Sequence, residues 1–174
     1  MPELITPSPR LHSSWLDAQA EWGADAHMDG AGLDADDDVE SAEGFAEWTG
    51  RLRRRSDRTT AVEHGRVHAT HWWITEGDTY LGAIDLRHHL NAFLLDAGGH
   101  IGYSVRPTAR RRGLAGWALD QVLHEARLMG MDRVLLTCDP GNEPSQRTIE
   151  GAGGVLEDVR DTLVGPKRRY WVTL

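Results

Sequence analysis

The sequence has a single cysteine, no long apolar run and no visible internal repeat. The lone Cys138 excludes an internal disulfide framework and suits a reducing cytoplasm. No apolar stretch approaches the roughly 18 residues that a membrane-spanning helix needs. The opening stretch MPELITPSPRLHSS lacks the apolar core flanked by basic residues that marks a secretory signal. We therefore expect a cytoplasmic protein without a membrane partner.

Charge and missing nucleotide motifs exclude further classes. The net charge is -8 and the pI about 5.5, which argues against a general nucleic-acid binder. The sequence contains neither the G-x-G-x-x-G dinucleotide fingerprint nor the GK[ST] ending of an NTPase phosphate loop. With 174 residues, 40% of them apolar and 26% charged, the chain fits one α/β domain with a core of its own.

One acidic stretch resembles the start of a calcium loop. Asp34, Asp36 and Asp38 have the required spacing. The sixth and twelfth positions need Gly and Glu but hold Val39 and Phe45. No other His, Cys and Asp spacing matches a metal site. We predict no metal site and a solvated acidic loop over residues 23–40.

The rest of the chain predicts alternating strands and helices. Before residue 70 we expect an extended arm over Leu4–Arg10 and two helices. The first runs to about Trp22 with Ser13 or Ser14 as its cap, and the second runs from Ala42 to about Ser56. Ser41 should cap the last helix, and the late Arg51–Arg55 run follows the helix dipole, so we interpret it as structural. We assign the tryptophans of these and the next segments to the core: Trp15, Trp22, Trp48, Trp72 and Trp73.

From residue 71 the order is strands, helix, strand, helix and hairpin. The expected strands are His71–Glu76, Tyr80–Arg87, Ile101–Val105, Val134–Cys138, Val155–Arg160 and Arg169–Leu174. A loop over residues 88–98 precedes the central strand, and an amphipathic helix ends near Met129. This order predicts an α/β (α+β) fold in which a mixed central sheet has helices on both faces.

The segment Ile101–Gly116 carries the most information. A short alternating strand leads into a turn rich in Arg and Gly, and then into a helix. A helix N-terminus has unpaired N–H groups and a partial positive charge, which attract phosphate. Gly113 and Ala115 allow close approach to the backbone, and the arginines add positive charge. The alternative is a solvated basic loop that caps an ordinary helix.

These residues resemble the GNAT superfamily of acyl-CoA N-acyltransferases. Arg110-x-x-Gly113-x-Ala115 matches the motif (Gln/Arg)-x-x-Gly-x-(Gly/Ala), which holds the coenzyme A pyrophosphate in that family. The sequence also resembles a group of bacterial GNAT proteins that share LRHxLN, GGHIGYSVRP and TCDxxN stretches. In this sequence they are Leu86–Asn91, Gly98–Pro107 and Thr137–Asn142. The resemblance implies one GNAT-like domain over residues 1–174, with an N-terminal arm and helices over 1–70 and a coenzyme A-binding core over 71–174.

The resemblance also implies roles for named residues. Two central strands should splay apart and hold the pantetheine arm in the gap, with the Val105 N–H facing the thioester carbonyl. The implied coenzyme A contacts are Tyr103, Ser104, Val105, Arg110, Arg111, Arg112, Gly113, Leu114, Ala115, Gly116, Asn142 and Ser145. No metal is implied.

The proton donor for the leaving thiolate departs from the family pattern. Many members have a Tyr seven residues after the Asn, where this sequence has Ile149. Cys138, Tyr103, Tyr170 or water could substitute. Cys138 also suggests a covalent acyl-enzyme, although a lone Cys at the end of a buried strand is usually a packed small hydrophobe.

His100 is the expected general base. It begins the central strand, and imidazole titrates near neutral pH. The alternative is a structural histidine bonded to a nearby carbonyl. His88, His89 and Asn91 could line the acceptor site.

Two functions follow. One is an N-acetyltransferase that passes an acetyl group from acetyl-CoA to a primary amine, either a small molecule or a peptide, by direct attack in a ternary complex. The other is an acyl-CoA-binding regulatory or interaction protein without turnover. The acidic net charge favours a cationic acceptor. A homodimer is left open.

Overall fold

The computed structural model describes residues 1–23 and 26–174, so residues 24 and 25 of the predicted acidic loop lie outside the described residues. The strands are β1 (Glu3–Ile5), β2 (Ala69–Glu76), β3 (Thr79–Arg87), β4 (Ile101–Val105), β5 (Arg133–Cys138), β6 (Val155–Thr162) and β7 (Gly165–Thr173). The helices are α1 (His12–Trp22), α2 (Ala42–Arg54), α3 (Leu114–Leu128) and α4 (Glu143–Gly151). Short turns of other helical types are η1 (Pro9–Leu11), η2 (Leu94–Gly98) and η3 (Pro107–Ala109).

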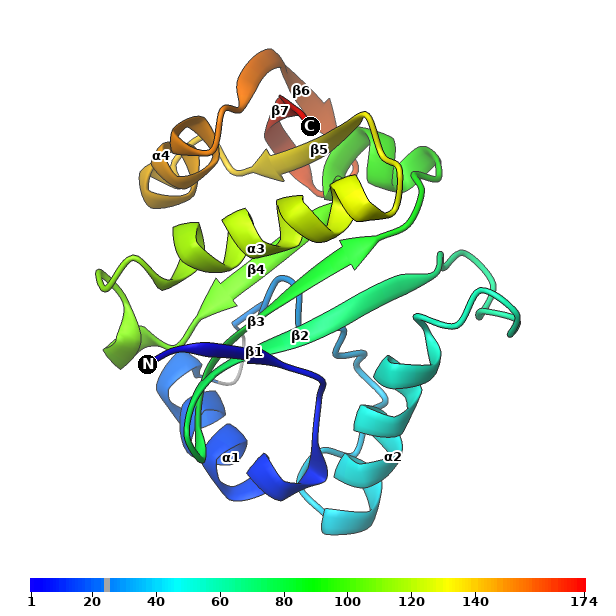
Figure 1. Ribbon diagram of the computed structural model, residues 1–174, viewed down its shortest axis with the longest axis vertical. Coiled ribbons are helices and arrows are strands. Elements are labelled where there is room, and N and C mark those ends of the chain that lie inside the picture. Colours follow the sequence, from blue (N-terminus) through cyan, green and yellow to red (C-terminus); the bar gives the residue numbers. More distant parts are fainter. Residues whose placement is uncertain (24–25) are drawn as a thin grey trace.

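The strands form two sheets that meet between β4 and β5. The first has the order β1-β2-β3-β4 and the second β5-β7-β6, and neighbouring strands within each pair antiparallel. At the junction, β4 and β5 point toward the same side of the molecule (Figure 1). The predicted fold class is confirmed.

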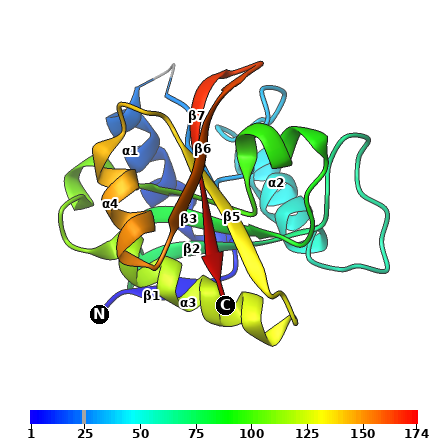
Figure 2. The same cartoon turned by 90° about the horizontal axis from the view of Figure 1, so that it is seen from above.

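Helices cover both faces of the first sheet. Figures 1 and 2 show α1 and α2 on one side of the first sheet and α3 on the other. Each face has its own buried cluster. Aromatic residues dominate the α1/α2 side, where Trp15, Trp48 and Trp73 are almost completely buried, as expected for core tryptophans. Aliphatic residues dominate the α3 side, where Leu119 and Val122 are fully buried. The site therefore forms on a sheet that is packed from both sides.

Two local expectations were wrong. α1 starts at His12, so neither Ser13 nor Ser14 caps it; the Ser14 hydroxyl instead accepts a hydrogen bond of 2.9 Å from the Tyr80 N–H on β3. The segment expected as a plain loop before the central strand contains the π-helical turn η2, which Asn91 starts by accepting a 2.9 Å bond from the Leu94 N–H. In contrast, Ser41 caps α2 as predicted, accepting from the Gly44 N–H at 3.0 Å.

The junction of the two sheets is a close contact between backbones. Gly99 has a φ of +67°, and a Cβ there would lie 2.6 Å from the Leu135 carbonyl oxygen, so only glycine fits. The next residue, His100, donates its backbone N–H to that oxygen at 2.7 Å, and its ring Nδ1 accepts from the Leu135 N–H at 2.8 Å. His100 thereby joins β4 to β5 at one end.

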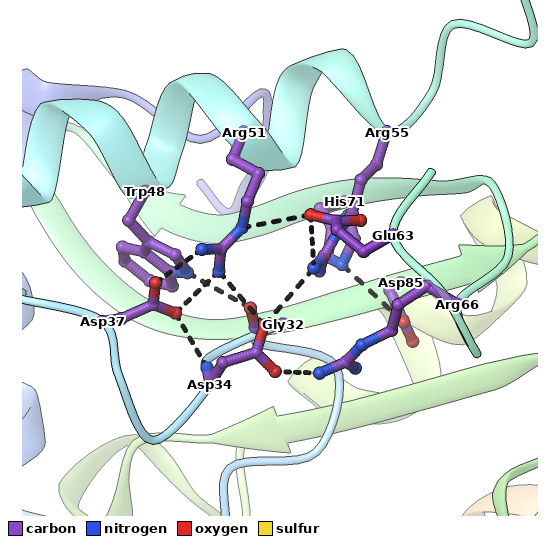
Figure 3. Close-up of polar contacts among 10 residues, drawn as sticks. All are labelled: Gly32, Asp34, Asp37, Trp48, Arg51, Arg55, Glu63, Arg66, His71 and Asp85. Atoms are coloured by element: carbon purple, nitrogen blue, oxygen red, sulfur yellow. Dashed lines mark hydrogen bonds and ion pairs between the residues drawn. The ribbon is translucent and has the colours of Figure 1, made fainter. Parts of the chain in front are cut away.

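The acidic loop is not simply solvated. Figure 3 shows its carboxylates turned toward the arginines of α2. Asp37 receives two bonds from Arg51, at 2.6 and 2.7 Å, and Asp34 contacts Arg51, Arg55 and Arg66. The structural interpretation of the arginine run agrees with these contacts. The predicted solvation was wrong because pairing the loop with α2 neutralises both partners while covering the aromatic core.

The Arg51–Asp37 pair should contribute to stability. Asp37 keeps only 7% of its side chain exposed, so Arg51→Met would leave a mostly buried carboxylate without its bidentate partner. We expect a loss of about 1–3 kcal/mol in the free energy of unfolding, measured by urea denaturation. Arg147→Met is the matched control, because Arg147 pairs with Glu143 on the exposed surface of α4 and should cost less than about 0.5 kcal/mol. Equal effects of the two substitutions would contradict this assignment.

His100 should make the fold sensitive to acid. Burial lowers the pKa of His100 from 6.5 to about 4. Between these pH values the unfolded chain binds a proton that the folded chain does not, so the free energy of unfolding falls as the pH falls through this range. His100→Phe should be less stable at about pH 7.5 by about 1–3 kcal/mol, because the Leu135 N–H loses its acceptor.

The difference in the free energy of unfolding between the wild type and His100→Phe should be smaller at about pH 5. At that pH only the wild type loses stability through the titration of residue 100. Urea denaturation at both pH values measures it. A difference that does not change with pH would show that the titration of His100 is not linked to folding.

Candidate functional site

The edge of β4 that faces β5 carries backbone groups directed into the junction. At the two ends of the β3–β4 ladder, the Arg87 N–H donates to the His100 carbonyl and the Arg106 N–H donates to the Leu81 carbonyl, each at 2.7 Å. In an antiparallel pair, successive residues alternate between the two edges of the strand. The backbone N–H and C=O groups of the even-numbered residues of β4 therefore face β3. The N–H groups of Tyr103 and Val105 face the gap toward β5.

This alternation divides the predicted pantetheine contacts. Tyr103 and Val105 present their backbone to the gap, as the resemblance implies. Ser104 presents its backbone to β3, and its side chain lies on the opposite face of the sheet from Tyr103. The Ser104 hydroxyl oxygen is buried without a hydrogen-bond partner among the described residues. Ser104 therefore belongs to the α1/α2 face of the site.

The turn between β4 and α3 forms an open cradle. Arg111 has a φ of 62° and Gly113 a φ of 75°, so the chain turns sharply into the helix. Gly113 is the N-cap of α3 and provides no side-chain bond to the N–H groups of the first turn. A Cβ added at Gly113 or Gly116 would meet nothing within 4 Å among the described residues. The first turn of a 15-residue helix is thus accessible to an anion.

The arginines beside the cradle have different positions. Arg110 donates from Nε to the Val105 carbonyl at 3.1 Å, and Arg112 pairs with Glu76 on β2 at 2.7 Å. Arg111 is exposed. Of the three predicted phosphate contacts, Arg112 is therefore partly neutralised, whereas Arg110 is held at the end of β4.

α1 holds the start of the same turn. The Glu21 carboxylate accepts from Arg106 at 2.6 Å and from the Thr108 N–H at 3.1 Å. The arginine and the N–H group hold the pKa of Glu21 below its usual value despite the opposing effect of burial. Sequence reasoning missed this contact, because it joins residues more than 80 positions apart.

α4 lies across the gap from β4. Asn142 is its N-cap, and its side chain accepts from the Ser145 N–H at 3.2 Å. The Ser145 hydroxyl shares a hydrogen bond of 2.7 Å with the Tyr103 hydroxyl. Burial raises the pKa of Tyr103 to about 12, so the phenol keeps its proton at neutral pH. Tyr103 and Ser145, both predicted as coenzyme A contacts, are thus brought together as a pair of hydroxyl groups.

The other proposed proton donors differ in their environments. Tyr170 is fully buried, donates its hydroxyl to Glu150 at 3.1 Å and accepts from Arg168 at 2.7 Å. Ile149, at the position of the family tyrosine, is also fully buried in the core. Cys138 is 6% exposed, and burial raises the pKa of its thiol. These placements favour the Tyr103–Ser145 pair over Tyr170, whose proton is held by Glu150.

His100 lies at the wrong end of β4 for a base. Its Nδ1 is bonded to β5, and its lowered pKa of about 4 makes the ring a weak proton acceptor. His100 and Val105 are five residues apart in an extended strand, or about 17 Å. The geometry favours the structural alternative for His100. The partner of its ring is the backbone N–H of Leu135, whereas a carbonyl was expected.

The residues expected to line the acceptor site lie at that same end. His88 and His89 line a surface hollow together with His100 and Trp171. The His88 ring is bonded to Thr70 at 2.9 Å, and burial lowers its pKa to about 4. Asn91 supports η2, as described above. The contacts of His88 and Asn91 are thus structural, and all three residues lie at the end of β4 that is far from Val105.

Among the described residues, no helix is both long and apolar enough to cross a membrane. In the same part of the chain, no group of three or more His, Cys, Asp or Glu side chains is placed to hold a metal ion.

Solved acetyltransferase structures share the fold. RimL, a ribosomal L7/L12 alpha-N-protein acetyltransferase in complex with coenzyme A, in which coenzyme A forms a disulfide with a cysteine, has a TM-score of 0.73 at 15% identity, covering 99% of this chain and 94% of that chain. An acetyltransferase from Salmonella typhimurium that modifies the N-terminal serine of the 50S ribosomal subunit protein L7/L12 has a TM-score of 0.67 at 15% identity, covering 99% and 95%.

A third similar structure is the microcin C7 self-immunity acetyltransferase MccE in complex with acetyl-CoA and AMP, with a TM-score of 0.69 at 13% identity, covering 99% and 92%. At these identities the likeness concerns the fold alone. A search of curated proteins by sequence finds no match. The acetyltransferase (GNAT) domain family matches residues 12–155, and the chain therefore belongs to the GNAT acetyltransferases and is an acyl-CoA-dependent acetyltransferase.

Proposed function

We propose that this protein transfers the acetyl group of acetyl-CoA to a primary amine by direct attack in a ternary complex. One observation carries the proposal: β4, the strand that borders the gap, is followed in the sequence by a turn into an open helix N-terminus. The Tyr103 and Val105 N–H groups border the gap, and the turn through Gly113 leads directly into α3. An extended arm that ends in a pyrophosphate has this shape. Such a cosubstrate supplies an activated acyl group.

The residues present fit that cosubstrate. The first turn of α3 would hold the pyrophosphate, with Arg110 and Arg111 beside it. The Val105 N–H would donate to the oxyanion that develops on the thioester carbonyl, a type of contact that typically lowers a barrier by about 2.7–4 kcal/mol. The Tyr103–Ser145 pair would give a proton to the leaving thiolate. We place Asn142 beside the pantetheine arm. Its side-chain Oδ1 already accepts the hydrogen bond from the Ser145 N–H that caps α4.

We propose a peptide or protein N-terminus as the acceptor class, with small amines as the alternative. The similar structures of RimL and of the Salmonella typhimurium protein are named for acetylation of a ribosomal protein, the latter at an N-terminal serine. An α-amino group has a pKa near 7.7–8.0, so a useful fraction is neutral at physiological pH. A peptide with a free N-terminal serine and the same peptide with a blocked N-terminus distinguish these acceptors from side-chain amines.

A second candidate is an acyl-CoA-binding protein without turnover. Ile149 at the usual tyrosine position is the observation that favours it. Thioester consumption with a panel of peptides and small amines separates the two: binding of acetyl-CoA without any consumption would support the second function.

Gly113 should control coenzyme A binding. Asp and Asn both tolerate a left-handed backbone and both can cap a helix, so Gly113→Asp and Gly113→Asn differ mainly by one negative charge at the cradle. We expect Gly113→Asp to weaken acetyl-CoA binding by at least about tenfold relative to Gly113→Asn, or about 1.4 kcal/mol. Calorimetry measures the affinity, and the shift in melting temperature gives an independent value. The cradle assignment would be wrong if the two variants bound acetyl-CoA equally.

Cys138 should not carry the acetyl group. Its buried thiol has a raised pKa, which disfavours the nucleophilic thiolate. We expect Cys138→Ser to keep most of the turnover, and no acetylated protein to accumulate with acetyl-CoA alone. Intact-protein mass spectrometry distinguishes an acetyl adduct from a coenzyme A disulfide by mass. An acetyl group on Cys138 that added amine discharges would instead establish a ping-pong mechanism.

A further inference from the structure

We call the α1/α2 face of β4, which bears the Ser104 hydroxyl, the acceptor face. The loop over this face carries a histidine–aspartate pair to which the sequence analysis gave no role. His27 and Asp29 are joined between Nε2 and Oδ1 at 3.1 Å. Their side chains are 83% and 65% exposed, in contrast to the buried His71 and His100. An exposed pair can meet an acceptor that arrives from solvent.

The loop that carries the pair is fixed over β4. Gly30, the residue after Asp29, has a φ of +77°, and a Cβ there would lie 2.3 Å from the Gly102 carbonyl oxygen. Met28 and Ala31 are buried in the aromatic core, and the Ala31 N–H donates to the Met28 carbonyl at 3.2 Å. These anchors hold the pair on the face of β4 that also bears the Ser104 hydroxyl.

The charges around the pair connect it to the gap. Burial is the main cause of the raised pKa of Tyr103, and the negative charge of Asp29 adds to it. The hydrogen bond to Asp29 raises the pKa of His27. Burial opposes this effect, and the positive charges of Lys167 on β7 and Arg87 on β3 oppose it further. Lys167 itself pairs with Asp139, just past the end of β5. The approach of Gly30 to Gly102 places the pair beside the part of β4 that carries Tyr103.

Other candidate bases on this face are occupied. Asp85 is 3% exposed, accepts from the Gly102 N–H at 2.8 Å and contacts Arg87 at 3.1 Å. The His100 ring is bonded to β5. Ser104 has no basic partner within the described residues.

We propose that His27, oriented by Asp29, accepts the proton that the acceptor amine loses during acetyl transfer. This inference rests on the proposed function. With Nε2–H donating to Asp29, Nδ1 is left to take the proton, directly or through one water molecule. The amine nitrogen forms a bond to the thioester carbonyl carbon and the carbon–sulfur bond breaks. The Tyr103–Ser145 pair gives a proton to the thiolate and then takes up a proton from solvent. His27 releases to solvent the proton that it took from the amine.

The pH dependence of turnover provides the test. Acetyl-CoA and a peptide with a free N-terminal serine are the substrates, and kcat is measured from about pH 5.5 to 9. His27→Gln should lower the plateau of kcat by roughly 10²-fold or more and remove the limb that depends on His27. Asp29→Asn should move that limb to lower pH, because loss of the carboxylate lowers the pKa of His27.

The controls separate this inference from the proposed function. His124→Gln changes an exposed histidine of α3 and should leave the profile unchanged. All variants should keep the acetyl-CoA-induced rise in melting temperature, since the pair is exposed and lies outside the cradle. Wild-type transfer together with an unchanged profile in His27→Gln and Asp29→Asn overturns the role of His27 alone. Absence of transfer from the wild-type protein to any amine overturns the proposed function and, with it, this inference.

Discussion

The contact of Gly99 and His100 with Leu135 is the constraint on which the site depends. It brings the two sheets together at one end of β4 through two hydrogen bonds, one of them to a ring nitrogen. Beyond this point the backbone groups of Tyr103 and Val105 face β5 across the gap. A continuous ladder there would have satisfied them and closed the site. Among the described residues β4 and β5 form no such ladder, so an extended substrate can accept from the Tyr103 and Val105 N–H groups.

Packing on both faces makes this interruption tolerable. The aliphatic cluster under α3 and the aromatic cluster under α1 and α2 hold β4 from either side. Polar contacts then position the loops that border the gap: Glu21 holds the turn into α3, and the arginines of α2 hold the acidic loop (Figure 3). The cradle and the acceptor face are therefore attached to a rigid sheet, which limits their motion relative to β4.

The acid and the base that we propose lie on different sides of the gap. Tyr103 and Ser145 lie on the α4 side, where burial keeps the phenol protonated. His27 and Asp29 lie on the α1/α2 side, where both are exposed and the Asp29 carboxylate raises the pKa of the imidazole. An acid and a base on opposite sides of one reacting carbon suit the replacement of a thiolate by an amine. The acid gives a proton to the thiolate, and the base takes one from the amine.

Local sequence determined the order of elements, the fold class and the cradle. The alternation through Ile101–Val105 and the glycines after it depend on short-range geometry, so they could be recognised directly. The tertiary structure decided what each titratable side chain does. The sequence around His100 does not distinguish it from a catalytic histidine. In the fold, the backbone N–H of Leu135, 35 residues away, donates a hydrogen bond to its ring nitrogen. His27 and Asp29 look like part of a polar loop until Gly30 places them over β4. Burial and partners are set by contacts between distant residues, and no local pattern contains them.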